Sequence, residues 1–571
     1  MTRQLGPRAL AVLGLLLVVA CDDGTSPTDN PSLEFAQSVL PLGEARTGSV
    51  VVRNTGTRTV GPIEIVVGPV RRAGLDIPGA TVTADPSEIG SLAPGDGAIV
   101  TLHVTGAEGL QHGTYSADLS ARVRTSPLAS AAVSFLVPVP GDLVGSIEIV
   151  GLPASLRQGD VVQLVAVVYD TLGAVVEEAT VGWATVPGGI GIITASGEFV
   201  PYATGDYSIV ASAGTHADTA AITVAARGLL GNFSIVGSNA PEFYRTSDLW
   251  LFGDIAYTGT WGGDRLYAWN IAGGMPVLTD SVVVSASNVN DVKISADGSF
   301  ALMTQEGGSG QAVTLLDMSD PAHPTVAGAF TVSESGWHGV HNAWIEGDYA
   351  YLATNGSSPT RGLWIINVSD LANPVRVAQF YGGSSSLHDV YVRDGLAFLS
   401  HWDAGLIILD VGNGIRSGSP TNPVEVSRIA GLGGQTHNAW YWPATGYVFV
   451  GEEDFGAPGY MHVVDASDLL NPREVGSYRV AGDAPHNFWL DEERAILYLA
   501  WYSRGLHALD VSGRLLGNLE LQGRRIAEST YAGDGGCFGG GGTCTWAPQL
   551  HNGYVFVSDI YNGIWKLQPN F

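Results

Sequence analysis

The feature that most constrains this chain is an internal repeat that runs from about residue 245 to its C-terminus. The strings LWIINVSDLANP, from Leu363, and HVVDASDLLNP, from His462, are two clear copies, and related strings begin at residues 266, 314, 406, 506 and 564. The copies recur roughly every 45 to 50 residues, and each holds about four runs of strand length. Such a unit cannot bury both faces until neighbours stack against it. The repeat therefore predicts a seven-bladed β-propeller.

The pattern DxSDxxNP makes these strings resemble the LVIVD repeat, a family of bacterial β-propeller repeats, over nearly all of residues 245–571. The resemblance implies a fold and no particular reaction. The last copy ends at Phe571 after only three strands, so the segment NFSIVGSN, residues 232–239, is predicted to supply the missing strand. Closing the ring in this way removes exposed sheet edges. Residues 228–571 are thus expected to form an LVIVD-type propeller closed by strand 232–239.

The N-terminus resembles an export signal. Arg3 and Arg8 precede an apolar run, residues 9–20, that is too short to span a bilayer but suits a signal peptide. The string VVAC resembles a bacterial lipobox, which would make residues 1–21 a lipoprotein signal peptide with Cys21 as the lipidated residue. The alternative is an ordinary secretory signal with a chance cysteine. Residues 22–31 are polar and proline-containing, as expected of a flexible tether.

The remaining cysteines and the charge agree with an exported protein of the cell envelope. Cys537 and Cys544 frame a glycine-rich loop, which predicts a local disulfide in an oxidising compartment. A metal pair is the weaker interpretation, because no His or Cys lies nearby at zinc spacing. The formal charge of -28 excludes nucleic acid and anionic lipid headgroups as partners. We therefore expect contact with the membrane, at its periplasmic or external surface, through the lipid anchor alone.

Two further domains are predicted between the tether and the propeller. Residues 32–140 hold short alternating runs such as SVVVRNTG and AIVTLHVTG, typical of an Ig-like β-sandwich. Residues 141–227 resemble the group 2 bacterial Ig-like domain (Big2) through YDTLGAVV, GDYSIVASAG and Trp183, which is expected to be the core indole. The predicted fold is therefore all-β, with two Ig-like β-sandwiches followed by a seven-bladed β-propeller. Such sandwiches serve as spacers or adhesive modules.

A unit of His, Asn or Asp, any residue, and an aromatic begins the predicted innermost strand of four consecutive blades. The four histidines are His341, His388, His437 and His486. SDLW, NDVK and WAPQ, from residues 247, 290 and 546, hold the same place in the other blades. Strand alternation predicts that each histidine and the residue after it point to opposite sides. The aromatics at the fourth position are expected to fill the gaps between adjacent blades.

Two interpretations of the histidines remain open. Each imidazole could tie a loop to the neighbouring strand by a hydrogen bond, which repetition favours because structural constraints repeat and active sites seldom do. Alternatively, neutral imidazoles that converge on one channel mouth are the usual ligands of Zn, Cu, Ni or Fe. The four histidines are therefore candidate metal ligands, and a divalent metal ion is the one cofactor that the sequence suggests.

Aromatic and acidic loops are predicted to open on the same face as the histidines. Side chains of this kind suit a glycan, a peptide or a divalent cation. With the four histidines, the candidate ligand-binding residues are Asp389, Trp402, Asp403, Glu452, Glu453, Asp454, Trp501 and Tyr502. We expect an exported, lipid-anchored binding or scaffold protein whose partner is a glycan, a peptide or an envelope protein. The alternative is a cell-envelope hydrolase or metal-dependent enzyme with its site at the same mouth; no residue is assigned as catalytic.

Overall fold

The computed structural model describes residues 32–571 except 36–38, 43–45, 57, 95, 112, 125, 138–142, 178, 308–310, 333–336, 357–360, 384–385, 431, 433, 455–458, 481–482, 535 and 538–541. The described residues form strands and turns without a helix, so the prediction of an all-β chain is confirmed. None of them accordingly forms a helix able to cross a bilayer. The predicted signal peptide, Cys21 and the tether lie outside the described residues.

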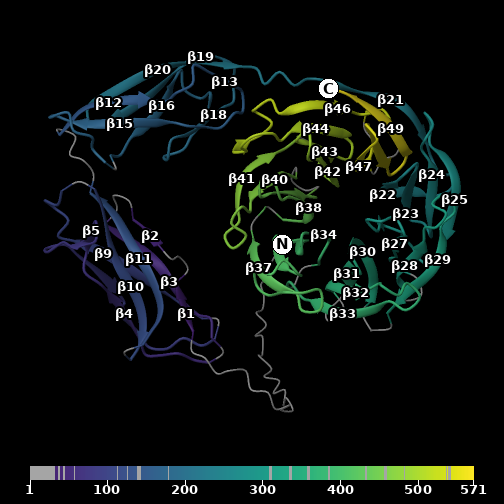
Figure 1. Cartoon of the computed structure of the whole chain (residues 1–571), viewed down its shortest axis with the longest axis horizontal. Coiled ribbons are helices and arrows are strands. Elements are labelled where there is room, and N and C mark those ends of the chain that lie inside the picture. Colours follow the sequence, from purple (N-terminus) through teal and green to yellow (C-terminus); the bar gives the residue numbers. More distant parts are fainter. Residues whose placement is uncertain are drawn as a thin grey trace, which may run out of the picture. The chain divides into compact units, whose positions relative to one another are not determined.

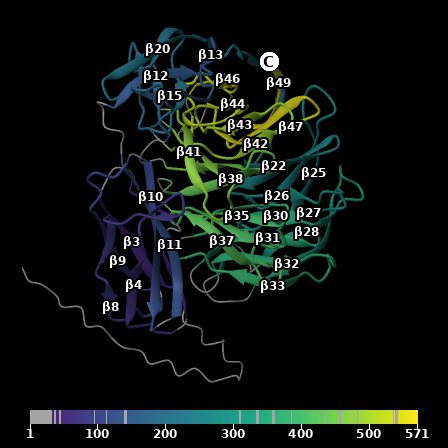
Figure 2. The ribbon, with the colours of Figure 1, turned by 60° about the vertical axis from the view of Figure 1, so that its left-hand side comes forward.

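The first ordered domain consists of two sheets that share one core. In strand β10 every second side chain is buried, as expected for a strand with one face on a core. Tyr115 of this strand stacks on Phe135 of β11, its antiparallel neighbour in Figure 2, at 5.5 Å between ring centroids. The sheets have the strand orders β1 (Leu33–Phe35), β3 (Thr47–Asn54), β9 (Gly97–Thr105), β7 (Thr81–Asp85), and β2 (Val39–Pro41), β11 (Ser126–Val137), β10 (Gly113–Val123), β4 (Ile63–Val67), β8 (Glu88–Ile89), and a hairpin, β5 (Arg71–Arg72) and β6 (Leu75–Asp76), joins β10.

Residues 144–225 form three smaller sheets. Phe199, Ile209 and Ile222 are buried in a common cluster, and Trp183 packs against it while remaining half-buried. The expectation that Trp183 is the central core residue is therefore wrong, because smaller side chains fill the centre. The sheets are β12 (Val144–Val150) with β15 (Val165–Asp170); β13 (Ser155–Arg157), β20 (His216–Ala225), β19 (Gly205–Ala213), β16 (Gly182–Val186); and β14 (Val162–Gln163), β18 (Glu198–Pro201), β17 (Gly191–Ile193).

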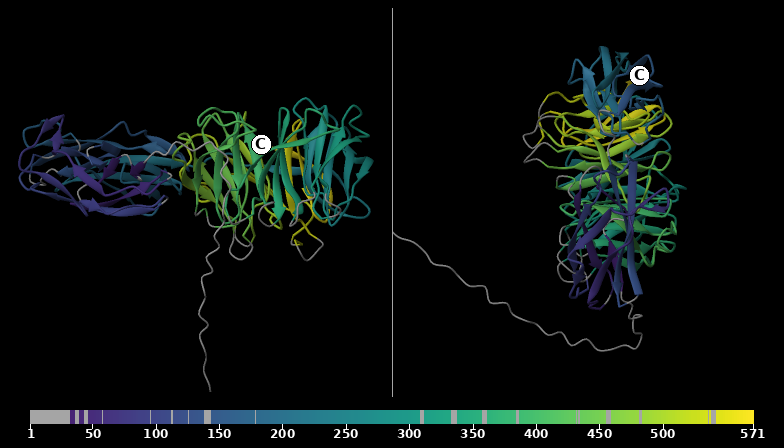
Figure 3. Two further views of the ribbon diagram at one scale, coloured as in Figure 1. Left: turned by 90° about the horizontal axis from the view of Figure 1, so that it is seen from below. Right: turned by 90° about the vertical axis from the view of Figure 1, so that its left-hand side faces the viewer.

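The described residues from 232 onward form seven sheets arranged in a ring (Figure 1). The innermost strands β22, β26, β30, β34, β38, β42 and β47 contact one another in that order, and β47 contacts β22, so the ring is closed. Figure 3 shows the same sheets from the side. A repeat β-propeller is thus confirmed.

We number the sheets 1 to 7. From the channel outward they are β22 (Arg245–Phe252), β23 (Ile255–Trp261), β24 (Arg265–Asn270), β25 (Val277–Val283); β26 (Val292–Ile294), β27 (Phe300–Thr304), β28 (Gln311–Asp317), β29 (Thr325–Thr331); β30 (Trp337–Glu346), β31 (Tyr349–Gly356), β32 (Gly362–Asn367), β33 (Val375–Phe380); β34 (Asp389–Arg393), β35 (Leu396–Ser400), β36 (Leu406–Asp410), β37 (Val424–Ile429); β38 (Thr436–Trp442), β39 (Tyr447–Glu452), β40 (Met461–Asp465), β41 (Arg473–Tyr478), β45 (Gly517–Asn518); β42 (Phe488–Asp491), β43 (Ile496–Ala500), β44 (Leu506–Asp510), β46 (Arg525–Ser529); and β47 (Thr545–His551), β48 (Tyr554–Asp559), β49 (Gly563–Asn570), β21 (Asn232–Asn239).

Sheet 7 is built from both ends of the ring. Its outer strand β21 precedes sheet 1 in sequence and pairs antiparallel with β49, with Asn232 opposite Asn570 and Asn239 opposite Ile564. The hydrogen bonds of the sheet therefore join the start of the ring to its end. The second and third strands of each sheet explain the apolar runs in the sequence: β35 and β36 are buried at every residue, because neighbouring sheets cover both faces.

Aromatic side chains from the inner strands fill the channel at one level. Tyr391 and Trp489 each lie 5.0 Å from Trp440 between ring centroids, and Trp250 lies 5.7 Å from Trp344 and 5.9 Å from Trp489. The prediction that these rings fill the gaps between neighbouring sheets is therefore wrong. The fourth residue of the unit points into the channel, so the rings meet one another there and narrow it.

Replacing Trp440 by Ala should destabilise the propeller by about 3 kcal/mol, because it removes a ring that contacts two aromatic neighbours and the cores of sheets 4 to 6. Thermal unfolding of the variant and the wild type measures the effect. Phe243→Ala is the matched control, since Phe243 is 69% exposed. An unchanged melting temperature for Trp440→Ala would refute a stabilising role of the aromatic level.

Candidate functional site

Above the aromatic level, the inner strands of sheets 3 to 6 bring the four predicted histidines into one arc. The ring centroids are 4.2 Å apart for His341 and His388, 4.3 Å for His388 and His437, and 4.2 Å for His437 and His486. Trp546 of sheet 7 continues the arc, 4.3 Å from His486. The repeat thus places the same position of successive sheets side by side around the channel.

A β-bulge changes the direction in which the histidines point. The pairing between β30 and β31 shifts between Val340 and Asn342, and that between β38 and β39 shifts between Thr436 and Asn438. The extra residue is the histidine, and a bulge interrupts the alternation of a strand. One cavity is consequently lined by His341 together with Asn342. The expectation that these two residues face opposite sides is corrected by the bulge.

Two of the imidazoles are held by carbonyl groups of the next sheet. His388 Nδ1 lies 3.2 Å from the carbonyl oxygen of His437, and His486 Nδ1 lies 2.7 Å from that of Trp546. A carbonyl only accepts hydrogen bonds, so Nδ1 carries the hydrogen and Nε2 of the neutral ring keeps its lone pair. These bonds tie neighbouring sheets together, as the first interpretation of the histidines expects, and they fix the direction of Nε2.

His341 differs from the other three, since both of its ring nitrogens are engaged. Nδ1 donates to Glu306 Oε1 at 2.6 Å, and Nε2 lies 3.3 Å from the side-chain amide nitrogen of Asn290. Burial opposes the charged form of His341, but the Glu306 carboxylate outweighs it and raises the pKa of the imidazole. His341 therefore does not offer a free nitrogen to the channel.

The carboxylate of Glu453 faces the other three histidines. Its oxygens lie 3.7 Å from His437 Nε2, 3.9 Å from His388 Nε2 and 4.0 Å from His486 Nε2. Burial raises the pKa of Glu453 to about 7, although the hydroxyl of Tyr502 donates a hydrogen bond to this carboxylate. The three imidazoles and the carboxylate form what we call the His/Glu cluster.

Burial also lowers the pKa values of His388, His437 and His486 well below the ordinary value, and neighbouring histidines add to the effect. The three rings are therefore neutral. His437 is 2% exposed, and its ring nitrogens make no hydrogen bond of ordinary geometry among the described residues, although the side chain of Asn438 interacts with the ring. Ligand atoms of His388, His437 and Glu453 all lie within 4.8 Å of one another, which is near but wider than the spacing of donors to one metal ion.

Two aromatic residues with an unusual backbone conformation pack on the cluster. Trp402 stacks on His388 at 4.8 Å between centroids, and Tyr502 lies edge-on to His486 at 5.0 Å. Their φ angles are 31° and 35°, in the left-handed region that side chains other than glycine rarely adopt. Strained conformations of this kind concentrate at binding and active sites. The rings of Trp402 and Tyr502 therefore restrict the orientation of the His388 and His486 imidazoles.

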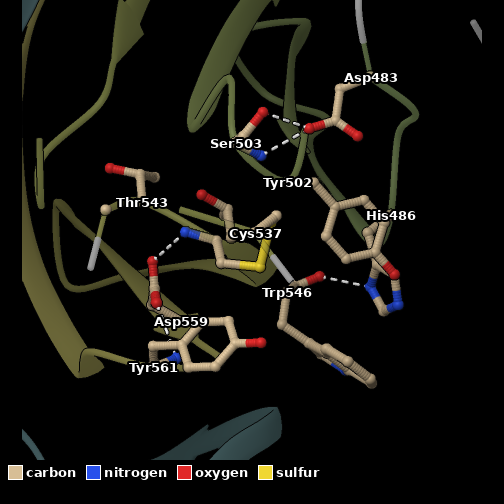
Figure 4. Close-up of a disulfide and its surroundings, with 12 residues drawn as sticks. Asp483, His486, Tyr502, Ser503, Cys537, Thr543, Trp546, Asp559 and Tyr561 are labelled. Carbon is tan, nitrogen blue, oxygen red and sulfur yellow. Dashed lines mark hydrogen bonds between the residues drawn. A yellow bond between two sulfur atoms is a disulfide. The ribbon is translucent and has the colours of Figure 1, made fainter. Parts of the chain in front are cut away.

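A cavity of about 240 Å³ opens above the cluster. Figure 4 shows Tyr502, Trp546 and His486, which line it, close to the disulfide between Cys537 and Cys544. This disulfide confirms the prediction made from the glycine-rich loop. The other lining residues are Arg245, Trp261, His341, His388, Glu453, Ile560 and Tyr561.

Five other predicted site residues lie away from this cavity. Trp501 is fully buried in the core, with its ring 5.5 Å from that of Tyr478, so its expected place on the rim is wrong. Asp403 is exposed and Asp454 is half-buried. Asp389 lies below the histidines, and burial raises its pKa to about 7.

Glu452 belongs to a separate buried cluster. Its carboxylate lies 3.4 Å from His462 Nε2, and Glu474 lies 2.8 Å from His462 Nδ1. Glu452 therefore points away from Glu453, its neighbour in sequence, as Trp501 points away from Tyr502. Sequence reasoning missed Asn290, Arg245 and Trp546 as parts of the site, although Trp546 could have been found because it takes the place of the histidine in its repeat.

The His462 cluster predicts a pH-dependent stability. Burial alone would lower the pKa of His462, but Glu452 and Glu474 outweigh it and raise the value to about 9. The stabilisation by the His462 cation is therefore complete below the unfolded-state value of 6.5 and is lost as the pH rises through about 9. The melting temperature of His462→Gln should fall further below that of the wild type at pH 6 than at pH 10. A difference that does not change with pH would contradict this assignment.

A known repeat family matches two neighbouring sheets of the ring. The family described as LVIVD repeat matches residues 339–380 and 384–430, which correspond to sheets 3 and 4. No curated protein matches the chain. Among solved structures, the β-propeller domain of Cps50 (Swd1) from Myceliophteria thermophila is similar, with a TM-score of 0.44 and 10% identity over 59% of this chain and 98% of that one. The C-terminal WD40 domain of Sif2 gives a TM-score of 0.40 and 12% identity over 64% and 89%. The chain is thus a repeat β-propeller protein that carries LVIVD repeats.

Proposed function

We propose that this protein is an exported, lipid-anchored binding protein of the cell envelope, and that the mouth of its seven-bladed propeller binds a divalent transition-metal ion. In this proposal Cys21 carries the lipid, and two Ig-like domains act as spacers between the membrane and the propeller. The metal ligands are the carboxylate of Glu453 and the Nε2 atoms of His388 and His437, and His486 is the fourth donor within reach.

One observation carries the proposal: three neutral imidazoles, the buried His437 and His486 and the partly exposed His388, surround one carboxylate. Histidines that bind metals usually donate their second N–H to a carbonyl or carboxylate, which fixes the tautomer and the ring. His388 and His486 make such bonds to backbone carbonyls. In the described part of the chain, the ring nitrogens of His437 are buried without a hydrogen bond of ordinary geometry, a cost that a ligand would relieve.

The distances support an ion at this place. Donors to a Zn²⁺ ion lie about 2.0 to 2.2 Å from the metal, so two donors of the same ion lie roughly 3 to 3.5 Å apart. The observed separations of 3.7 Å and 3.9 Å between Glu453 and the two histidines are slightly longer than this, and all three donors lie within 4.8 Å of one another, so the side chains must move closer together to hold an ion. Imidazole with carboxylate suits Zn, Fe, Ni or Cu, whereas Mg and Ca prefer oxygen alone.

A metal-dependent enzyme, such as an envelope hydrolase, is the second candidate. The observation that favours it is the cavity above the cluster, because Glu453, His388 and His486 line its wall. A metal ion held by three protein ligands with one side open can bind a substrate or activate a water molecule. The metal supplies the Lewis acid in that case, and the protein orients the imidazoles through their carbonyl bonds.

Metal analysis of protein purified without a histidine tag tests the proposal. We expect about one Zn²⁺ per chain to bind after reconstitution, measured by elemental analysis and titration calorimetry. The double variant His388→Ala/His437→Ala should bind Zn²⁺ at least about 100-fold more weakly. Loss of a residue that merely orients a metal ligand already weakens binding by about 10- to 100-fold, and here two ligands are removed. His341→Gln should retain Zn²⁺ binding, because both nitrogens of His341 are already engaged.

His323→Ala controls for adventitious binding to exposed histidines, since the side chain of His323 is 59% exposed. Equal binding by the double variant and the wild type would contradict the proposed ligands. Absence of any tightly bound transition metal in the reconstituted wild type would contradict the metal site itself.

A further inference from the structure

The cavity above the His/Glu cluster has walls made of rings. Trp261 and Trp546 pack against each other at 5.4 Å between centroids, and Tyr561 and Ile560 line the same cavity. The neighbouring disulfide packs against this group through Cys537 and Cys544. Aromatic walls of this kind favour a flat apolar ligand over a polar, flexible one.

One cation lies at the edge of these walls. The guanidinium of Arg245 lies 4.8 Å above the centre of the Tyr561 ring. Stacking engages the face of a guanidinium and leaves the N–H groups along its edge free to bind a carboxylate. Arg245 makes no ion pair within the described part of the chain, in a protein with 55 acidic and 27 basic residues besides histidine. Arg245 is exposed, so the free edge of its guanidinium can bind an anion that enters the cavity from solvent.

In the metal-free protein, the opposite end of the cavity does not suit an anion. The carboxylate of Glu453 lies at the floor, beside the imidazoles of His388 and His486. His341 also reaches the cavity, but Glu306 already binds its Nδ1. The charged groups therefore run from a cation at the rim to a carboxylate at the floor, which sets the direction in which a ligand enters.

The volume limits the size of the ligand. Sites for drug-sized molecules measure about 300 to 1,000 Å³. The cavity, at about 240 Å³, is smaller. A single small molecule fits it better than an extended glycan or peptide.

We propose that this cavity binds a small aromatic carboxylate, with the carboxylate against Arg245, the ring against the wall formed by Trp261, Trp546 and Tyr561, and the far end toward the His/Glu cluster. This inference rests on the proposed function in that both use the channel mouth as the binding face. It names the class of ligand that the mouth selects.

Benzoate, benzamide and acetate are the probes, titrated into the full-length protein while tryptophan fluorescence and heat are recorded. Benzamide keeps the ring without the charge, and acetate keeps the charge without the ring. We expect benzoate to bind at least about tenfold more tightly than either. Arg245→Gln should weaken benzoate binding about tenfold and leave benzamide binding unchanged. Arg265→Gln is the matched control, because Arg265 pairs with Asp264 and does not line the cavity.

Equal affinities for benzoate and benzamide, or equal effects of both arginine variants, would overturn the inference. The same titrations in His388→Ala/His437→Ala separate it from the metal site. Preference for benzoate that persists there and still depends on Arg245 supports the inference whether or not metal binds. Preference that disappears together with the metal would show that the metal, and not Arg245, meets the carboxylate, and would overturn the assignment of Arg245.

Discussion

Pairing of β21 with β49 is the constraint on which the rest of the propeller depends. It joins the segment before sheet 1 to the last strand of the chain, so that the inner strands contact one another in an unbroken circle. The closed circle places equivalent positions of neighbouring sheets side by side, and for the histidines it brings the centroids of adjacent imidazole rings to about 4 Å. The His/Glu cluster is thus a consequence of ring closure as much as of any one strand.

The two interpretations of the histidines turn out to be compatible. An imidazole has two nitrogens, and the structure uses them differently: in His388 and His486, Nδ1 holds the next sheet while Nε2 faces Glu453. A repeated structural bond therefore orients a row of lone pairs toward one point. His341 illustrates the alternative outcome, because Glu306 and Asn290 occupy both nitrogens and leave only the structural role.

Periodicity made the fold readable from the sequence, whereas local departures from periodicity hid the site. The repeat, the segment 232–239 and the cysteine pair each follow from spacing and composition. The bulge at His341 and His437 does not, because a strand with one extra residue looks like any other in sequence, and alternation then assigns the wrong side. Glu452 and Glu453 are adjacent residues of the same type, yet Glu452 faces His462 and Glu453 faces His437 at the channel mouth. Arg245 begins the first sheet and Tyr561 follows the second strand of the last sheet, and only the closed ring brings the two side chains together.

In the proposed metal site, imidazole nitrogens and a carboxylate at the channel mouth hold one ion. X-ray absorption spectroscopy of the zinc-loaded, tag-free protein measures these bonds directly. We expect the zinc ion to have nitrogen and oxygen neighbours at about 2.0 to 2.2 Å, no sulfur neighbour, and the multiple scattering of at least two imidazole rings. A zinc environment of oxygen alone, without imidazole scattering, would contradict the proposed site.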